Sequence, residues 1–171
     1  QCLSSGDVAV DATCGNGHDT LFLAKLPLSA LFSIDIQQTA IENTQRLLEA
    51  NLSHEELSRI HLRCLSHENW ESVPFPQAPQ LFVYNLGYLP RGDKTFTTQT
   101  ATTLSSIKKA LTLVKEGGSI SITCYPGHDE GEKEEQALLL FAQSLPAKQW
   151  QVCHHRWINH AARSPTLLWI T

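Results

Sequence analysis

Short apolar runs alternate with amphipathic helical stretches from one end of this sequence to the other. Several runs, such as residues 81–85, are apolar at nearly every position, which is typical of strands covered on both faces of a parallel sheet. The expected strands are residues 8–11, 31–36, 60–65, 81–85, 119–125, 150–158 and 166–170, and the expected helices are 19–26, 38–51, 101–114 and 132–145. This order predicts an α/β fold with a doubly wound, seven-stranded sheet that is mostly parallel and ends in an antiparallel hairpin.

Composition narrows the class of protein. The 171 residues contain no linker or repeat, which predicts a single domain over residues 1–171, and the absence of Met suggests that the amino terminus before Gln1 is trimmed. A formal net charge of −4 disfavours a generally basic protein that coats nucleic acid. The five cysteines are scattered and form no C-x-x-C pair, which argues against a disulfide framework and a zinc finger. With no membrane-length apolar run and no leader pattern, we expect a cytoplasmic protein.

The loop after the first strand has the features of a nucleoside-binding turn. Gly15 and Gly17 allow a ligand to approach the backbone. Asp35, at the end of the second strand, follows Gly17 at close to the roughly 20-residue spacing expected of an acid that binds a ribose. Thr20 stands where a dinucleotide fingerprint needs its third glycine, which disfavours NAD. A carboxylate at Asp11 would repel a pyrophosphate and attract an ammonium or sulfonium group. These residues favour S-adenosylmethionine, and the alternative is that they only shape the turns.

A longer series of residues carries a specific family resemblance. It comprises residues 10–20, Asp35, 66–68, 85–93 and 125–128 with Glu132. This series resembles a small family of class I, Rossmann-like methyltransferases that was first described as rRNA methylases and is now associated with tRNA. The resemblance implies that S-adenosylmethionine methylates the amino group of 5-aminomethyl-2-thiouridine at the tRNA wobble position. The cofactor-binding residues that we expect are Asp11, Thr13, Gly15, Asn16, Gly17, His18, Asp19, Thr20, Asp35, Ile36, Ser66, His67 and Asn85.

The loop after the fourth strand is the expected substrate loop. It lies where amino-methyltransferases carry an Asn-Pro-Pro-Tyr type of sequence, and Leu86-Gly87 replaces the two prolines, which makes planar amines such as DNA adenine less expected substrates. An aliphatic amine must lose a proton before it can attack, so a proton acceptor is required. The catalytic residues that we expect are Asn85 to orient the amine, Tyr88 to stack on the base, and His128 or Asp93 to receive the proton.

Several histidines have simpler interpretations. His67 is as well explained as a solvated loop histidine, and His18 as a residue at a helix start. The cluster of His154, His155 and His160 could suggest a metal site. However, the adjacent residues His154 and His155 point to opposite faces of a strand, and no carboxylate lies near them at the spacing of metal ligands. We therefore expect no metal.

The charge pattern bears on the partner. Residues 91–116 are locally basic and border the expected site, whereas residues 129–135 are acidic, and both patterns are also typical of solvated helix faces. Arg156 and Arg163 are further candidates for phosphate contacts. We expect tRNA as substrate and no membrane partner, with a homodimer left open. The alternatives are an rRNA methyltransferase, a non-catalytic nucleoside-binding module that contacts RNA, and a nicotinamide-dependent reductase, against which the missing glycine argues.

Overall fold

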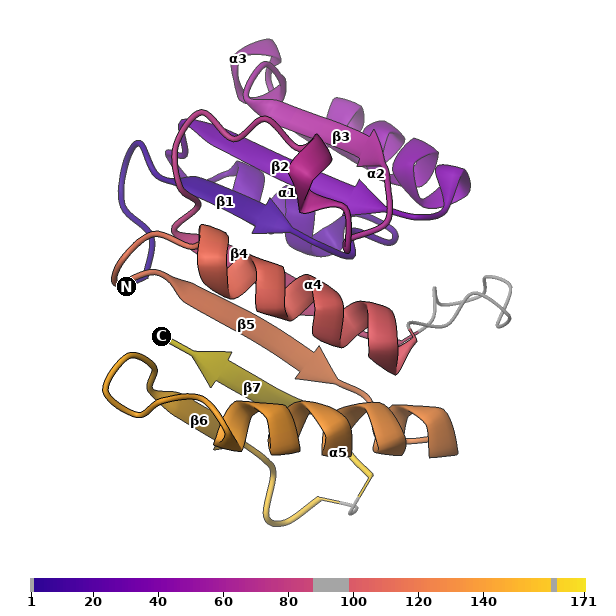
Figure 1. Ribbon diagram of the computed structural model, residues 1–171. Helices are drawn as coiled ribbons and strands as arrows, with labels where there is room; N and C mark the ends of the chain where they lie inside the picture. Colours follow the sequence, from indigo (N-terminus) through magenta and orange to yellow (C-terminus); the bar gives the residue numbers. More distant parts are fainter. Residues whose placement is uncertain (1, 88–98, 161–162) are drawn as a thin grey trace.

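The computed structural model describes residues 2–87, 99–160 and 163–171 (Figure 1). The strands in these ranges are β1 (Val8–Asp11), β2 (Ala30–Asp35), β3 (Ile60–Cys64), β4 (Leu81–Asn85), β5 (Ser119–Cys124), β6 (Val152–His155) and β7 (Thr166–Ile170). The helices are α1 (His18–Ala24), α2 (Gln38–Asn51), α3 (His54–Leu57), the 3₁₀ helix η1 (Trp70–Ser72), α4 (Thr100–Leu113) and α5 (Asp129–Gln143).

The strands form one seven-stranded sheet in the order β3-β2-β1-β4-β5-β7-β6. The first five strands pair in parallel, and β7 lies antiparallel between β5 and β6. The predicted α/β class, the seven strands and the antiparallel end of the sheet are therefore confirmed. The strand order reverses between β1 and β4, and in doubly wound sheets ligands bind at the carboxyl ends of the strands beside such a point.

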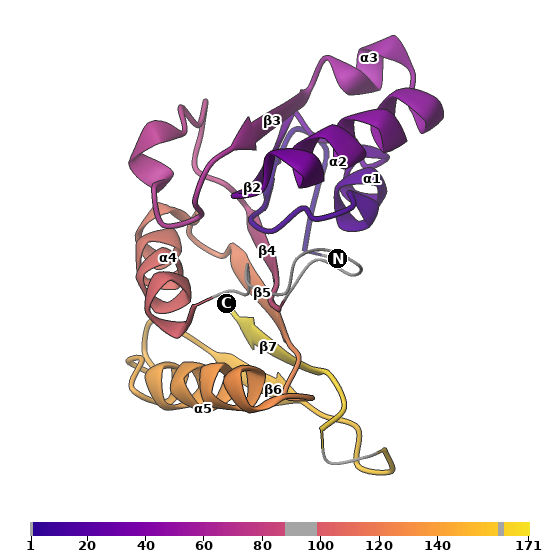
Figure 2. The same ribbon diagram turned by 90° about the vertical axis from the view of Figure 1, so that its right-hand side faces the viewer.

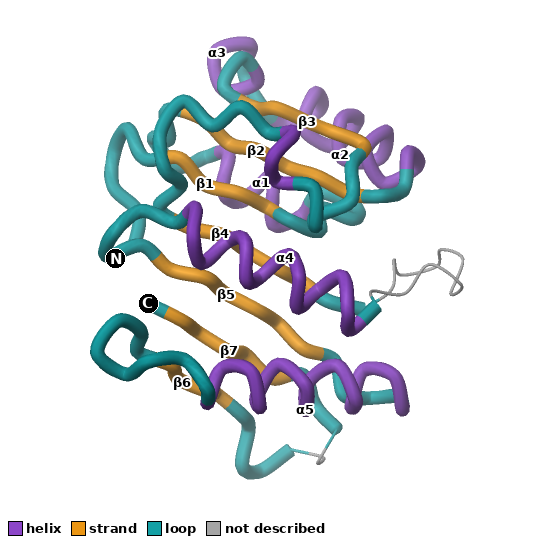
Figure 3. The backbone as a smooth tube through the Cα atoms, viewed as in Figure 1, coloured by secondary structure: helices purple, strands orange, loops and turns teal. Residues whose placement is uncertain are grey.

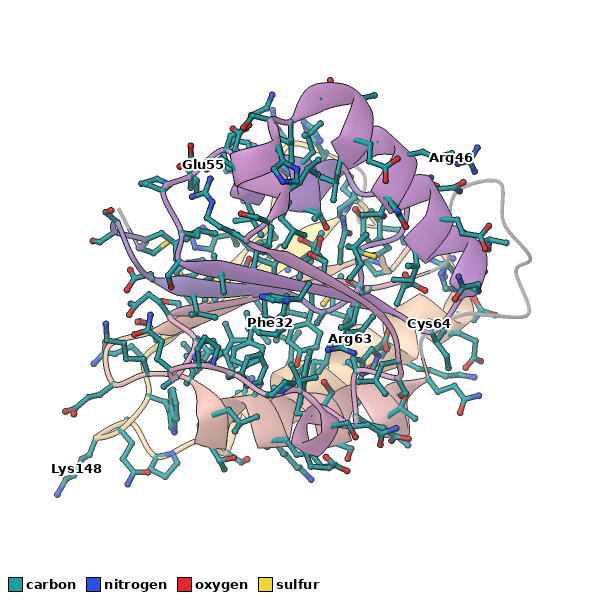
Figure 4. All side chains as sticks on the ribbon, turned by 90° about the horizontal axis from the view of Figure 1, so that it is seen from above. Phe32, Arg46, Glu55, Arg63, Cys64 and Lys148 are labelled. Carbon is teal, nitrogen blue, oxygen red and sulfur yellow. The ribbon has the colours of Figure 1, made fainter. Side chains whose placement is uncertain are left out.

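Helices cover both faces of the sheet, with α1 and α2 on one side and α4 and α5 on the other (Figure 2). The larger core contains Phe32, Phe82, Ile107 and Leu138 and lies on the side of α4 and α5. Figure 4 shows Phe32 in the crowded layer between the sheet and α4. A smaller cluster on the other face includes Leu23 of α1. Burial of these apolar side chains fixes both helical layers and, with them, the loops at the strand ends.

Three local features differ from the sequence prediction. Helix α3 was not predicted because it has only four residues, too few to show a periodicity, and it is held by a capping box between Ser53 and Glu56. Helix α5 begins at Asp129, earlier than the predicted residue 132, because the His128 side chain caps it. Strand β6 covers only Val152–His155, and all four of its residues are exposed.

None of the described helices combines the length and the apolar character that a membrane span requires.

Candidate functional site

The loop that follows β1 is bonded to the strands on both sides of β1, which are β2 and β4. Its Ala12 N–H donates to the Val83 carbonyl in β4 at 2.8 Å, and its Cys14 N–H donates to the Ile34 carbonyl in β2 at 2.9 Å. Figure 3 shows the connecting loops that leave the parallel strands at this edge. The carboxyl ends of β1, β2 and β4 are therefore adjacent, as the strand order requires.

Two glycines shape this loop because their backbones have positive φ angles of 54° at Gly15 and 84° at Gly17. Gly17 also packs tightly, since a Cβ atom there would lie 2.9 Å from the Cα atom of Thr44 in α2. The Thr44 hydroxyl in turn donates to the Gly15 carbonyl at 3.1 Å. Sequence spacing predicted the glycine turn, but it gave no sign that α2 buttresses it through Thr44.

Asp35 connects the first two strand-end loops. Its carboxylate accepts from the Gly15 N–H at 3.0 Å and from the Gln37 N–H at 2.9 Å. Burial raises the pKa of this carboxyl, and the backbone hydrogen bonds only partly offset that rise. The next residue, Ile36, has 63% of its surface exposed. A carboxylate beside an exposed apolar side chain fits a nucleoside, whose ribose hydroxyls donate hydrogen bonds and whose base offers an apolar face.

Asp11 lies beneath this loop, with none of its surface exposed. Its carboxylate accepts from the Thr20 hydroxyl at 2.6 Å and from the Thr13 N–H at 3.3 Å. Burial raises the pKa of Asp11 to about 7, with a smaller contribution from the charge of Asp19. Asp11 therefore braces the start of α1 through Thr20.

The Asp11→Asn variant is expected to be more stable than the wild type above pH 7. Because the folded state raises the pKa of Asp11 from 3.8 to about 7, it binds a proton more tightly than the unfolded chain, and stability falls as pH rises across this window. An asparagine keeps an acceptor for Thr13 and a donor for Thr20 but has no charge to bury. We expect equal stability at pH 4, and at pH 8 a gain of about 1–3 kcal/mol in the free energy of unfolding measured with urea. A wild-type difference between pH 4 and pH 8 that the variant fully retains would contradict this account.

The end of β4 brings four polar side chains together. The Asn85 side-chain Nδ2 donates to the Asp19 carboxylate at 3.0 Å, and the Asn85 backbone N–H donates to the Thr13 hydroxyl at 2.7 Å. Tyr125, which follows β5, shares a side-chain hydrogen bond with Asn85 and lies in the field of Asp19, while its partial burial raises its pKa. The sequence analysis did not select Tyr125 as a site residue. The available signals were its place in the family-like series of residues 125–128 and its position at the end of a strand.

His128 caps helix α5 through its ring. The Nδ1 atom accepts from the Gly131 N–H at 3.1 Å, so the proton of the neutral ring lies on Nε2. If His128 receives a proton at Nδ1 during the reaction, it must first release this helix cap.

The loop after β3 is fixed from below by one buried hydroxyl. The Ser106 hydroxyl of α4 donates to the His67 carbonyl at 2.6 Å and accepts from the Trp70 ring N–H at 3.0 Å. The Tyr84 hydroxyl lies 2.8 Å away and supplies the remaining contact. Burial lowers the pKa of His67 to about 4, and its ring packs against Tyr84 in an edge-on contact. His67 is therefore partly buried and not a freely solvated loop histidine, because its ring packs against Tyr84.

The remaining predicted residues fall in three groups. Asn16 lies on the loop after β1, where its side-chain oxygen accepts from Asn43 of α2 at 3.2 Å, and His18 lies in the first turn of α1. Ser66 begins the loop after β3, and its hydroxyl accepts from the Glu68 N–H at 3.5 Å. Tyr88 and Asp93 lie outside the described residues.

The charged side chains expected near the site are partly neutralised. Lys109 bonds to Glu71 at 3.1 Å, and Lys115 bonds to Asp7 at 3.4 Å. Arg163 bonds to Glu132 at 3.3 Å, which reduces its capacity for a phosphate contact. In the described parts of the chain, no group of three or more His, Cys, Asp or Glu residues is placed to hold a metal ion.

Comparisons with known proteins agree with this geometry. Residues 31–171 match the family model described as "Putative rRNA methylase". The chain is 36% identical over 167 residues to the chloroplastic tRNA (mnm5s2U34)-methyltransferase of Arabidopsis thaliana, a match that covers 93% of this chain and 61% of that protein. The chain thus spans about three fifths of the length of this curated relative.

Two solved structures are similar over almost the whole fold. A structure titled as an rRNA-methylase from Clostridium thermocellum has a TM-score of 0.90 and 36% identity, covering 98% of this chain and 89% of that one. A methyltransferase structure from Streptococcus mutans, in complex with SAH (S-adenosylhomocysteine), has a TM-score of 0.87 and 32% identity, with the same coverage of 98% and 89%. The predicted class I methyltransferase fold is therefore confirmed.

Proposed function

The chain belongs to the rRNA-methylase family matched above, and from that premise we propose that it is an RNA methyltransferase that uses S-adenosylmethionine. Its substrate in this proposal is the amino group of 5-aminomethyl-(2-thio)uridine at the tRNA wobble position. The observation that carries the proposal is the contact between Asn85 and Asp19, which places an amide and a carboxylate beside the glycine loop. The name of the Arabidopsis relative supports the wobble uridine as target.

The residues of the first two loops fit the cofactor. Asp35 would accept from the ribose hydroxyls, and the exposed Ile36 would contact the adenine ring. Gly15 and Gly17 give the loop its positive φ angles and so would let the methionine portion approach the backbone, with Thr13, Asn16, His18 and Thr20 around it. Asp11 supplies buried negative charge near a cationic ligand, while Ser66 and His67 border the far side. Bound S-adenosylmethionine would supply an electrophilic methyl group.

The reaction itself places modest demands on the protein. The substrate nitrogen must be uncharged, aligned in-line with the methyl carbon and shielded from water, so positioning accounts for most of the catalysis. Asn85 is held from both sides, by Thr13 at its backbone and by Asp19 at its side chain, and its amide oxygen would accept a hydrogen bond from the substrate amine. Tyr88 would stack on the base, and His128 or Asp93 would take the proton.

A second candidate function has a specific observation in its favour. The family description and the Clostridium structure both name rRNA, so a methyltransferase acting on rRNA with the same site is the alternative. A nucleoside-binding module that contacts RNA without catalysis would use the same cofactor loops but would leave the contact between Asn85 and Asp19 without a purpose.

The proposed tRNA substrate bears on the compartment in which the protein works and on its oligomeric state. The described cysteines form no disulfide, which suits a compartment that keeps thiols reduced and contains tRNA, such as the cytoplasm. A homodimer would provide a larger surface for tRNA than one chain offers.

Labelled methyl transfer tests the proposed activity. Two parallel reactions contain the protein and methyl-labelled S-adenosylmethionine. One also contains tRNA from cells that lack the methylated wobble nucleoside, and the other contains unmodified rRNA. We expect label in tRNA alone. Label in rRNA alone would favour the second candidate, and cofactor binding without label in either RNA would favour the binding module.

A further inference from the structure

Asp19 lies beside the end of β4. It lies in the first turn of α1, its side chain is exposed, and its Oδ2 atom accepts from Asn85 Nδ2 at 3.0 Å. A carboxylate has about four lone-pair positions, of which this contact uses one. The bond to Asp19 uses Nδ2, and the Asn85 amide oxygen has two lone pairs, so it keeps an acceptor position even with Tyr125 bonded to the Asn85 side chain. The pair therefore offers acceptors on two neighbouring side chains at the end of β4.

The site concentrates negative charge. Asp11 ends β1, Asp35 ends β2 and Asp19 lies in the first turn of α1, and the charges of Asp19 and Asp35 both raise the pKa of Asp11. None of these three carboxylates takes part in a salt bridge between described residues. Such crowding costs free energy that cationic ligands would recover. The same charge repels RNA phosphates, so the exposed carboxylate of Asp19 beside the end of β4 suits a cationic group of a substrate.

Resting on the function proposed above, we propose that Asp19 binds the substrate's aminomethyl group in its ammonium form and so selects an amine among the substituents that a wobble uridine can carry. An ammonium group has three N–H donors. One would bond to Asp19 and a second to the Asn85 amide oxygen, and the third would leave to a proton acceptor, which frees the lone pair before the nitrogen attacks the methyl group. A neutral substituent at the same position would leave the Asp19 charge uncompensated.

RNA binding measures this selection without a methyl-transfer step. Two anticodon stem-loop RNAs that differ only in 5-aminomethyluridine or uridine at the wobble position are titrated, with S-adenosylhomocysteine present, and the Kd is read by fluorescence anisotropy. A hydrogen bond to a charged group predicts at least about a 10-fold preference of the wild type for the aminomethyl RNA. In Asp19→Asn the two Kd values are expected to agree within about twofold. Asp19→Glu, which keeps the charge, should retain part of the preference.

Glu55→Gln is the matched control because it makes the same change of charge on α3. Figure 4 shows Glu55 well away from Cys64, the residue at which β3 ends on the site side of the sheet. This variant is expected to keep the full preference. The sequence placed Asp19 among the cofactor-binding residues, and the present proposal assigns it to the substrate instead. The affinity of Asp19→Asn for S-adenosylhomocysteine alone should therefore remain near that of the wild type, which separates substrate recognition from cofactor binding.

Three results would overturn the inference: a wild type without preference, an Asp19→Asn variant that keeps the preference, or a variant whose affinity for S-adenosylhomocysteine falls as much as its affinity for RNA. Failure of the proposed function gives a different pattern. A wild type that prefers the aminomethyl RNA but transfers no methyl contradicts the function and leaves the ammonium contact standing. Methyl transfer to tRNA without any preference overturns the contact alone.

Discussion

Replacing Asn85 by alanine is expected to lower kcat by about 100-fold or more while leaving the affinity for S-adenosylmethionine nearly unchanged. The Asn85 side chain contacts Asp19, and its role in the proposed reaction is to orient the attacking nitrogen, a contact that matters most in the transition state. The β4 backbone is retained in the variant, including the Asn85 N–H that donates to Thr13. Steady-state kinetics on the modified tRNA and calorimetry with the cofactor measure the two quantities.

Asn51→Ala is the control for this substitution. Asn51 is an exposed residue at the end of α2, and its side chain donates to the Leu47 carbonyl of its own helix. We expect its kcat and cofactor affinity to match the wild type. If Asn85→Ala lowered cofactor affinity and kcat/KM by the same factor, Asn85 would be a cofactor ligand and its assignment to the substrate would be wrong.

Replacing Gly17 by alanine is expected to weaken cofactor binding by about 100-fold or more and to destabilise the fold by a few kcal/mol. Two effects combine, because the residue has φ of 84° and because the new Cβ atom would lie 2.8 Å from the Thr44 hydroxyl oxygen and 2.9 Å from its Cα. The loop must move away from α2, which displaces the Gly15 N–H that donates to Asp35. Calorimetry with S-adenosylhomocysteine and urea unfolding measure both losses.

Gly6→Ala separates the two effects. Gly6 has φ of 86°, almost the same as Gly17, but a Cβ atom there would meet nothing within 4 Å. It should therefore lose only the cost of a positive φ, about 1 kcal/mol of stability, and bind the cofactor normally. Equal losses of cofactor affinity in both variants would show that the contact with α2 does not hold the binding loop.

The sequence predicted the parts of the molecule that depend on local spacing. The alternation of apolar runs and helical stretches identified the seven strands, and the interval between the glycine loop and Asp35 placed these two on adjacent strands, where Asp35 bonds to the Gly15 N–H. Both depend on contacts within one βαβ unit, which a single spacing specifies. The insertion of β7 between β5 and β6 has no such local signal, because it is determined by how the last strands pack at the sheet edge.

The predicted site was less complete than the fold because its contacts join distant segments. Asp19, Asn85 and Tyr125 come from three separate elements and meet only when the parallel strands align. The sequence also did not indicate how far individual histidine side chains are buried. The contact with Tyr84 makes His67 a partly buried residue whose pKa burial lowers, and the capping of α5 gives His128 a structural contact that its position in the chain does not indicate.

Mass spectrometry of tRNA nucleosides tests the central claim most directly. The substrate is tRNA that carries 5-aminomethyl-2-thiouridine at the wobble position, incubated with the protein and S-adenosylmethionine bearing a deuterated methyl group, then digested to nucleosides. The account predicts that this nucleoside gains one deuterated methyl group on its amino nitrogen and that Asn85→Ala greatly slows the gain. An unchanged wobble nucleoside, from a wild-type protein that binds the cofactor, would contradict it.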